Sequence, residues 1–344
     1  MLKQLNITNF TVFTQATLEF SPGLNVIVGE NGTGKTHVLK LAYAVIAVIR
    51  KPTYSSRSFV YTEKLINTFR VEKIKNLLKK KINRDKLSKL DFSLKKNFNV
   101  SCFFDDPQID CEFGLDWANE KIIISRIPAK VLTNKSVFIP ARELLSIYPG
   151  FVSLYEGRYL EFEETYRDTC LLLGEPLLKK PMADLMSVLE EAMGGKVELE
   201  NGRFYLVTPA QGKLEMPLVA EGLRKLAMLA QLIAVGALEK DGYLFWDEPE
   251  ANLNPRLVKV VARVILQLAK AGIQIFIATH SYFLLKELDI LTIQQPIPTR
   301  YFSLLKGEDG VVVESGDSLD ELQSIVSLEE ELAQFDREQD ARHA

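Results

Sequence analysis

Histidine and cysteine are scarce in this chain of 344 residues. The three histidines are His37, His280 and His343, whereas a histidine-based nuclease or metal centre needs two or more clustered in one place. The three cysteines are scattered and form no Cys-x-x-Cys pair, so neither a disulfide framework nor a zinc site is indicated. The composition therefore argues against metal-centred nuclease chemistry within the chain itself.

Long apolar runs are also missing. None approaches the ~20 residues that a membrane-spanning helix needs. Residues 1–7 alternate polar and apolar positions like a strand and have no signal-peptide apolar region. We therefore expect a cytoplasmic protein without membrane contact. The net charge of −3 predicts no polyanionic partner for the chain as a whole, and its length suits one large domain with an insertion, or two domains.

The most informative sequence present is Gly-Glu-Asn-Gly-Thr-Gly-Lys-Thr at 29–36, which has the G-x-x-x-x-G-K-[ST] pattern of a P-loop. An apolar run at 24–28 predicts a strand before it, and a helix follows. The alternative is an ordinary glycine-rich turn. In a P-loop, Lys35 pairs with the β- and γ-phosphates and the Thr36 hydroxyl binds Mg²⁺. The residues expected at the nucleotide are Asn31, Gly32, Thr33, Gly34, Lys35, Thr36 and His37.

A second motif is the apolar run 243–246 followed by Asp247 and Glu248. A strand that ends in Asp-Glu is typical of a Walker B element. Asp247 is then expected to hold Mg²⁺, and Glu248 to polarise the attacking water. The alternative is a structural strand that ends in acidic turn residues. The position after a P-loop favours the catalytic interpretation.

The third motif is the apolar run 275–278, which ends at Thr279 and His280. Ligands of open α/β sheets bind at the carboxyl ends of the strands, so the three motifs are expected to meet at one edge of one sheet. At that edge His280 can donate to a γ-phosphate and orient water. A structural histidine is the alternative.

Together, the P-loop, the Asp-Glu-Pro-Glu sequence at 247–250 and the Ala-Thr-His-Ser sequence at 278–281 resemble ABC-type ATPases. The resemblance is closer to the soluble branch that includes RecF, the SMC/Rad50 group and the OLD family, with AAA ATPase domains of phage-defence systems. It implies an α/β fold: an ABC-type P-loop NTPase head with a mixed or parallel sheet, N-terminal antiparallel strands and a helical insertion lobe. It also implies a homodimer or higher homo-oligomer that holds two ATP molecules with Mg²⁺ between its heads.

In that family a signature loop of one subunit caps the γ-phosphate bound to the other. The matching sequence here is 219–226, and it departs from the Ser-Gly-Gly-Gln type. Ala220 stands in place of the serine and Glu221 in place of the first glycine, while Gly222 is kept as the expected nucleotide contact. The hydroxyl contact to the partner's ATP is thus lost.

Several polar residues near these motifs have open interpretations. Arg224 and Lys225, at the start of a helix, could meet phosphate or be surface charge. Residues 140–143 occupy the place of the family's Q-loop but contain no glutamine; Arg142 or Glu143 is either a contact of the γ-phosphate or of a Mg²⁺-bound water, or part of a structural ion pair. Residues 252–255 occupy the place of the D-loop.

The motifs divide the chain into an ATPase domain at 1–50 and 131–315, with a signature-bearing helical lobe at about 141–240, a basic helical and β insertion at 51–130, and an acidic C-terminal helix or tail at 316–344. Within the lobe the pattern predicts helices at 154–173 and 182–193, a hairpin at 196–208, and a helix from Pro217 to about Leu238.

Residues 62–97 are polar, helix-prone and strongly basic. The stretch is either a contact surface for DNA or an acidic partner, or a solvated helical insertion. We therefore expect an ATP-hydrolysing dimer that controls a partner effector, such as a nuclease or toxin encoded nearby, or DNA, in anti-phage defence or DNA repair. The alternatives are the nucleotide-binding subunit of a transporter and a DNA-tethering ATPase of the SMC/Rad50 kind.

Overall fold

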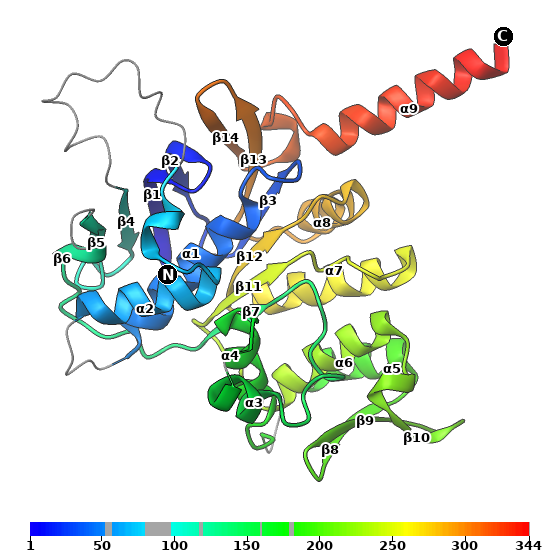
Figure 1. Cartoon of the computed structure of the whole chain (residues 1–344). Helices are drawn as coiled ribbons and strands as arrows, with labels where there is room; N and C mark the ends of the chain where they lie inside the picture. Colours follow the sequence, from blue (N-terminus) through cyan, green and yellow to red (C-terminus); the bar gives the residue numbers. More distant parts are fainter. Residues whose placement is uncertain (52–56, 80–97, 117–119, 159, 179–181, 344) are drawn as a thin grey trace, which may run out of the picture.

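The computed structural model describes the chain except for residues 52–56, 80–97, 117–119, 159, 179–181 and 344 (Figure 1). Three sheets and their covering helices make up the described part. No helix among the described residues is both long enough and apolar enough to cross a lipid bilayer.

The central sheet has six strands in the order β14-β13-β3-β12-β11-β7. Strands β13, β3, β12, β11 and β7 run parallel, and β14 joins β13 as an antiparallel edge. Its inner strands are continuous apolar runs because helices and a second sheet cover both faces. The strands are β3 (Leu24–Gly29), β7 (Ser136–Ile139), β11 (Tyr243–Asp247), β12 (Gln274–Ala278), β13 (Thr299–Gly307) and β14 (Gly310–Gly316).

A five-stranded antiparallel sheet in the order β2-β1-β4-β5-β6 covers one side. Helix α1 (Lys35–Ile49) shares one buried cluster with this sheet and with Phe138, Phe245 and Phe276 of the central sheet. Its sequence is apolar nearly all round because it is enclosed in this way. The strands are β1 (Leu2–Phe10), β2 (Phe13–Glu19), β4 (Asn99–Phe104), β5 (Cys111–Asp116) and β6 (Lys121–Arg126).

The pairing of β4 with β1 bears on the expected insertion at 51–130. Residues 99–126 were expected within a separate insertion, but β4 pairs directly with β1, and β5 and β6 extend the same sheet. Both strand sets bury an alternating face, and their buried residues belong to one cluster. Residues 99–126 are therefore continuous with the N-terminal strands.

The other face of the central sheet is covered by helices that pack in a second buried cluster (Figure 1). A three-stranded antiparallel sheet, β10-β9-β8, lies beside them at the end of the lobe. The elements are α3 (Phe151–Arg158), α4 (Glu164–Leu173), α5 (Ala183–Met193), β8 (Lys196–Glu200), β9 (Arg203–Thr208), β10 (Gly212–Glu215), the 3-10 helix η3 (Met216–Leu218), α6 (Glu221–Ala234), α7 (Pro255–Lys270) and α8 (Tyr282–Gln294).

Two predicted helices differ in the structure. The helix expected at 154–173 is divided into α3 and α4, and Glu163 before α4 is extended. The helix expected from Pro217 starts later, because Val219 and Ala220 are extended and α6 begins at Glu221. Propensity alone does not show these breaks, because the residues involved are compatible with either conformation.

The basic stretch 62–97 is not one long helix in its described part. Helix α2 (Arg57–Phe69) ends where Arg70 takes a left-handed φ of 49°, and only the short 3-10 helix η1 (Ile74–Leu77) follows. The apolar residues there pack along β1, with a bridge between Leu78 and Phe10. Residues 80–97 lie outside the described part of the chain.

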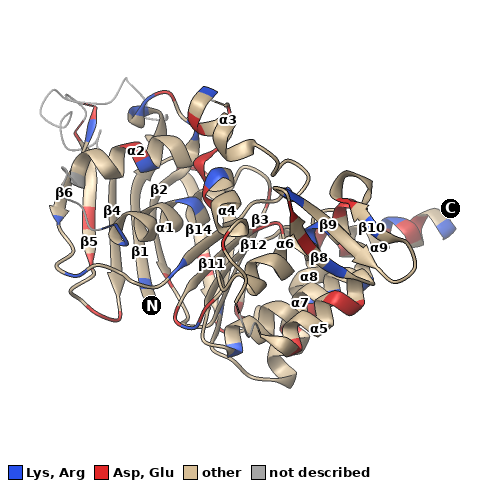
Figure 2. Ribbon diagram, turned by 90° about the horizontal axis from the view of Figure 1, so that it is seen from below, with Lys and Arg blue, Asp and Glu red and all other residues tan. Residues whose placement is uncertain are grey.

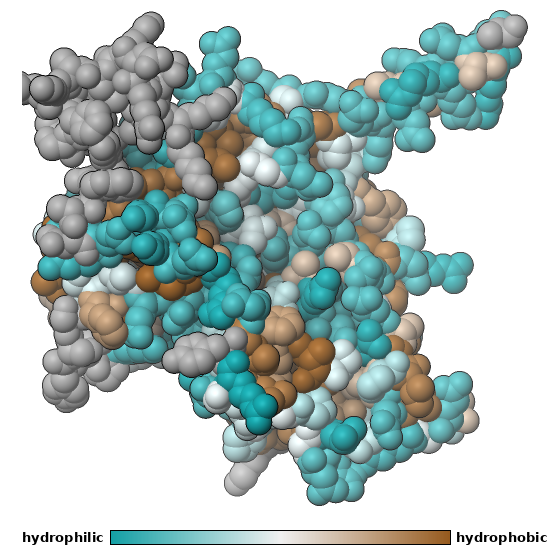
Figure 3. Space-filling view, in the orientation of Figure 1, coloured by the Kyte–Doolittle hydropathy of each residue, from teal (hydrophilic) through white to brown (hydrophobic). Residues whose placement is uncertain are grey.

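The C-terminal segment forms the short helix η4 (Leu319–Glu321) and then α9 (Val326–His343), which contains no buried residue. Helix α9 projects away from the body, and its visible surface is mostly hydrophilic (Figures 1 and 3). Its charged residues carry both signs (Figure 2), and Leu332 and Phe335 are each 58% exposed. Within 316–344, expected as an acidic helix or tail, the longest element is thus a helix.

Candidate nucleotide site

The P-loop joins β3 to α1 with an unusual backbone. Gly34 has a φ of 91°, and a Cβ atom there would lie 2.6 Å from the Val12 side chain, so only glycine fits. No side chain caps the first turn of α1. The backbone N–H groups at this helix start are thus available to an anionic ligand, which the helix dipole also favours.

Lys35 lies inside this loop, with its side chain folded back on the backbone. Its Nζ donates to the carbonyl oxygens of Gly29 at 2.8 Å and Glu30 at 3.0 Å. Burial lowers the pKa of Lys35, while the nearby carboxylates of Glu248 and Asp247 oppose the shift. The ammonium is therefore held at the position where the loop would enclose phosphate.

Thr36 and Asp247 meet across the edge of the central sheet. The Thr36 hydroxyl lies 3.0 Å from each carboxylate oxygen of Asp247. Burial raises the pKa of Asp247 to about 6, with a further contribution from the adjacent Glu248. A hydroxyl beside a half-buried carboxylate matches the oxygen donors that Mg²⁺ prefers, and a bound cation would favour the ionised carboxylate.

Glu248 and His280 face each other beside this pair. His280 Nδ1 lies 3.3 Å from Oε1 of Glu248 and 3.7 Å from Oε1 of Glu250. Thr279 donates to Glu250 at 2.6 Å, which anchors the end of β12 to the turn after β11. Glu248 has a left-handed φ of 47°, unusual for a residue with a side chain. The two proposed catalytic side chains are 31% and 55% exposed, so both are accessible to a ligand and water.

The parallel register explains why these residues meet. Asp247 pairs with Ala278, and Ala278 pairs with Ile27, so the three motifs leave the sheet at the same level. The expected convergence of the P-loop, Asp247 and His280 at one edge is present in the structure. A cavity of about 370 Å³ opens there and is lined by Val28, Gly29, Glu30, Asn31, His280, Lys306, Ile325, Val326, Ser327 and Glu330.

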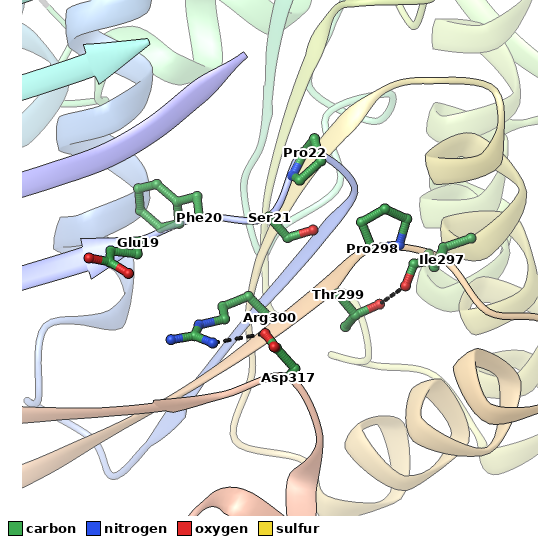
Figure 4. Close-up of a pocket in the computed structure, with 9 residues that line it drawn as sticks. All are labelled: Glu19, Phe20, Ser21, Pro22, Ile297, Pro298, Thr299, Arg300 and Asp317. Atoms are coloured by element: carbon green, nitrogen blue, oxygen red, sulfur yellow. Dashed lines mark hydrogen bonds and ion pairs between the residues drawn. The ribbon is translucent and has the colours of Figure 1, made fainter. Parts of the chain in front are cut away.

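A second cavity, of about 490 Å³, lies at the opposite edge of the sheet (Figure 4). Its lining includes Pro22, just before β3, and Thr299, at the start of β13. Arg300 is paired there with Asp317 at 2.8 Å. Because this cavity is at the amino ends of the strands, it is separate from the P-loop.

Comparison with known proteins identifies the family. The family described as "AAA domain, putative AbiEii toxin, Type IV TA system" matches residues 24–286 of the 344. The chain belongs to this family.

Curated proteins that are similar to this chain include DNA replication and repair protein RecF. The protein from Leptospira interrogans is 26% identical over 215 residues, which cover 62% of this chain and 55% of that protein. The protein from Streptococcus equi subsp. zooepidemicus is 38% identical over 60 residues, 17% of this chain and 16% of that one. The matches therefore span at most about half the length of these relatives.

Solved structures extend the similarity in fold. The SMC head domain from Thermotoga maritima superposes with a TM-score of 0.53 at 14% identity, covering 91% of this chain and 98% of that domain. An SMC head bound to the C-winged helix domain of ScpA gives 0.58 at 15% identity, covering 93% and 98%. The predicted fold and branch are confirmed: the chain is an ABC-type ATPase domain of the RecF/SMC-like branch.

Three predicted contacts of the nucleotide have other neighbours in this AAA domain. The His37 ring lies 5.6 Å from the Phe69 ring, and burial lowers its pKa to about 4, so the side chain is neutral in a packed setting. A Cβ atom on Gly222 would lie 2.8 Å from the carbonyl oxygen of Asn252, which gives this glycine a packing reason within the chain. Arg142 follows β7 at the sheet edge, and both it and Asp247 influence the pKa of Tyr166.

Glu143 was expected either at the ligand or in a structural ion pair, and the structure favours the ion pair. Glu143 is buried, and its Oε1 lies 2.8 Å from Nε of Arg224. It also accepts from the Ser146 backbone N–H at 3.1 Å. Glu143 is thus engaged within the chain. Of the two neighbours Arg142 and Glu143, Arg142 remains the one that could face a ligand.

Sequence reasoning missed two groups at the site. The sequence suggests a phosphate contact or a surface charge for Lys225, yet this residue is 2% exposed and its Nζ donates to backbone carbonyls. Burial lowers the pKa of Lys225 to about 8. The other missed group is the C-terminal segment, whose Ser327 and Glu330 line the cavity beside the P-loop. No local motif marks either group, because both depend on contacts between distant parts of the chain.

Proposed function

We propose that this chain binds and hydrolyses ATP and acts as a dimerising switch for a partner. The observation that carries the proposal is the meeting of Lys35, the Thr36–Asp247 pair and the Glu248–His280 pair at one edge of the sheet. Phosphate, a cation and an attacking water each have a suitable group there. Phosphate release by the purified chain with Mg²⁺ and ATP tests the activity, and ATP binding without any release would contradict it.

Each side chain has a role in this proposal. The P-loop backbone and Lys35 hold the β- and γ-phosphates, and Mg²⁺ held by Thr36 and Asp247 supplies charge neutralisation when bound. Glu248 accepts a proton from the attacking water. His280, 3.3 Å from that carboxylate, keeps it oriented and donates toward the γ-phosphate. Arg142 and Gly222 are assigned as further phosphate contacts, Gly222 acting on the ATP of a second subunit.

The exposure of this half-site supports the proposal of a homodimer. Glu248 and His280 are 31% and 55% exposed, so this side of the site is open to solvent. A second copy would bring its own signature segment to the open side. Water exclusion on closure would then complete the site.

The partner is proposed as an effector such as a nuclease or toxin, encoded nearby, in anti-phage defence or DNA repair. The description of the family names a toxin system, the RecF relatives are named for DNA replication and repair, and one similar SMC head is bound to a protein partner. Co-expression with neighbouring genes tests this: an effector whose activity differs between the wild-type chain and Glu248→Gln supports the switch. An effector indifferent to both contradicts it.

Replacing His280 with alanine is expected to lower kcat for ATP hydrolysis by about 10- to 100-fold, because Glu248 loses its neighbouring donor. The affinity for ATP should change by less than about threefold, since the phosphate contacts remain. His343→Ala, near the end of exposed helix α9, is the matched control and should hydrolyse ATP normally. If His280→Ala keeps wild-type kcat, the histidine is structural.

Direct DNA contact is tested at the basic stretch. Charge reversal of Lys79, Lys80 and Lys81 should weaken binding of a duplex by about tenfold or more and flatten its dependence on salt. Lys80 and Lys81 lie outside the described residues; Lys79 contacts Thr14 and the carbonyl of Asp309, so thermal stability is measured alongside. If the affinity for the duplex and its dependence on salt are both unchanged, the basic stretch serves packing or binds a protein partner.

A further inference from the structure

Lys225 is a buried lysine whose ammonium group binds backbone oxygen atoms. It lies on α6, 2% exposed, and its Nζ donates to the carbonyl oxygens of Glu248 at 2.8 Å and Ala251 at 3.1 Å. Within the described part of the chain it has no carboxylate at ion-pair distance. An ammonium group removed from water is stable only where its donors are used, so these carbonyls form its site.

The turn that Lys225 binds carries the proposed general base. The carbonyl oxygen of Glu248 also accepts from the backbone N–H of Ala251 at 3.1 Å, which closes the turn. Both Glu248 and Asn252 have left-handed φ values, 47° and 63°, so the turn bends sharply at each end. Such a backbone persists only where its surroundings hold it, and the direction of the Glu248 side chain depends on it.

Helix α6 holds the same turn at a second point. Asn252 donates its side-chain amide to Glu221 Oε1 at 2.9 Å. The carbonyl of Asn252 also approaches Gly222 so closely that no side chain would fit there. The first two turns of α6 are therefore fastened to both the beginning and the end of the segment Glu248–Asn252.

We propose that Lys225 is a positioning residue for ATP hydrolysis: it fixes the turn after β11 so that the Glu248 carboxylate faces the reacting water. Because Lys225 lies three residues after Gly222, the signature segment and the hydrolytic residue of one chain move as one unit. This inference rests on the proposed ATPase function. A role confined to folding would instead lower stability without acting through Glu248.

Lys225→Met tests the proposal, because methionine fills the space but cannot donate. We expect kcat to fall by about tenfold or more while the Kd for ATP changes by less than about threefold. Lys259→Met, on the exposed face of α7, is the matched control and should leave both unchanged. Thermal stability of each variant is measured with and without ATP.

The deciding measurement repeats Lys225→Met in the Glu248→Gln background, using single-turnover hydrolysis of labelled ATP. If Lys225 acts through Glu248, the second substitution should lower the residual rate by less than about twofold. An equal loss in both backgrounds, or wild-type kcat in Lys225→Met, would overturn the proposal. Should Lys225→Met fail to fold, Lys225→Leu, which also cannot donate, is judged by the same criteria. A wild-type chain without turnover would instead contradict the ATPase function itself.

Discussion

Alanine at Lys35 is expected to weaken Mg-ATP binding by at least ~100-fold, about 3 kcal/mol. The Lys35 ammonium is enclosed by the P-loop, where it donates to the carbonyls of Gly29 and Glu30. Phosphate oxygens would give this buried charge stronger partners than those carbonyls. Isothermal titration with Mg-ATP measures the loss, and hydrolysis should disappear at ATP concentrations that saturate the wild type.

The control for this loss is Lys259→Ala, which removes an exposed lysine on α7 and should bind ATP normally. Thermal stability distinguishes loss of a ligand contact from unfolding. If Lys35→Ala folds and binds ATP with wild-type affinity, the loop at 29–36 is a structural turn and the assignment of the nucleotide site is wrong.

Glutamine at Glu248 should lower kcat by about 100- to 1,000-fold and leave ATP binding intact. The amide cannot accept a proton from water, but it keeps the size of the side chain beside His280. ATP then remains unhydrolysed, so a dimer closed on ATP should accumulate. Phosphate release gives the rate, and light scattering with Mg-ATP gives the mass.

Glu308→Gln, on the exposed turn between β13 and β14, is the matched control and should hydrolyse ATP at the normal rate. Undiminished turnover in Glu248→Gln would mean that another carboxylate orients the water. Glu250 is the structural candidate, since it is buried, bound to Thr279 and 3.7 Å from His280.

The sequence predicted that the three motifs meet at one edge of the sheet, because each motif is local and its place is set by one rule. Apolar runs at 24–28, 243–246 and 275–278 are buried parallel strands, and the polar residues after them therefore meet at one edge. The resemblance to ABC-type ATPases indicated the RecF/SMC-like branch and the position of the signature sequence. The structure added the contact between Thr36 and Asp247.

What the sequence did not reveal are contacts between distant segments. Alternation in 99–126 predicts strands, but it does not say that β4 joins β1 across some ninety intervening residues. A lysine at a helix start resembles surface charge, and only the turn after β11 shows why Lys225 is buried. Nor does the sequence mark the end of α2, where Arg70 takes a left-handed φ of 49°.

The most direct test of the account is the rate of phosphate release per chain, measured with Mg-ATP over a wide range of protein concentration. If two copies complete each site, the rate per chain should rise with concentration and then level off as the dimer forms. Lys35→Ala should show no release at any concentration. A rate per chain that stays constant while the protein is a monomer would contradict the two-subunit site, and ATP binding without release would contradict the ATPase.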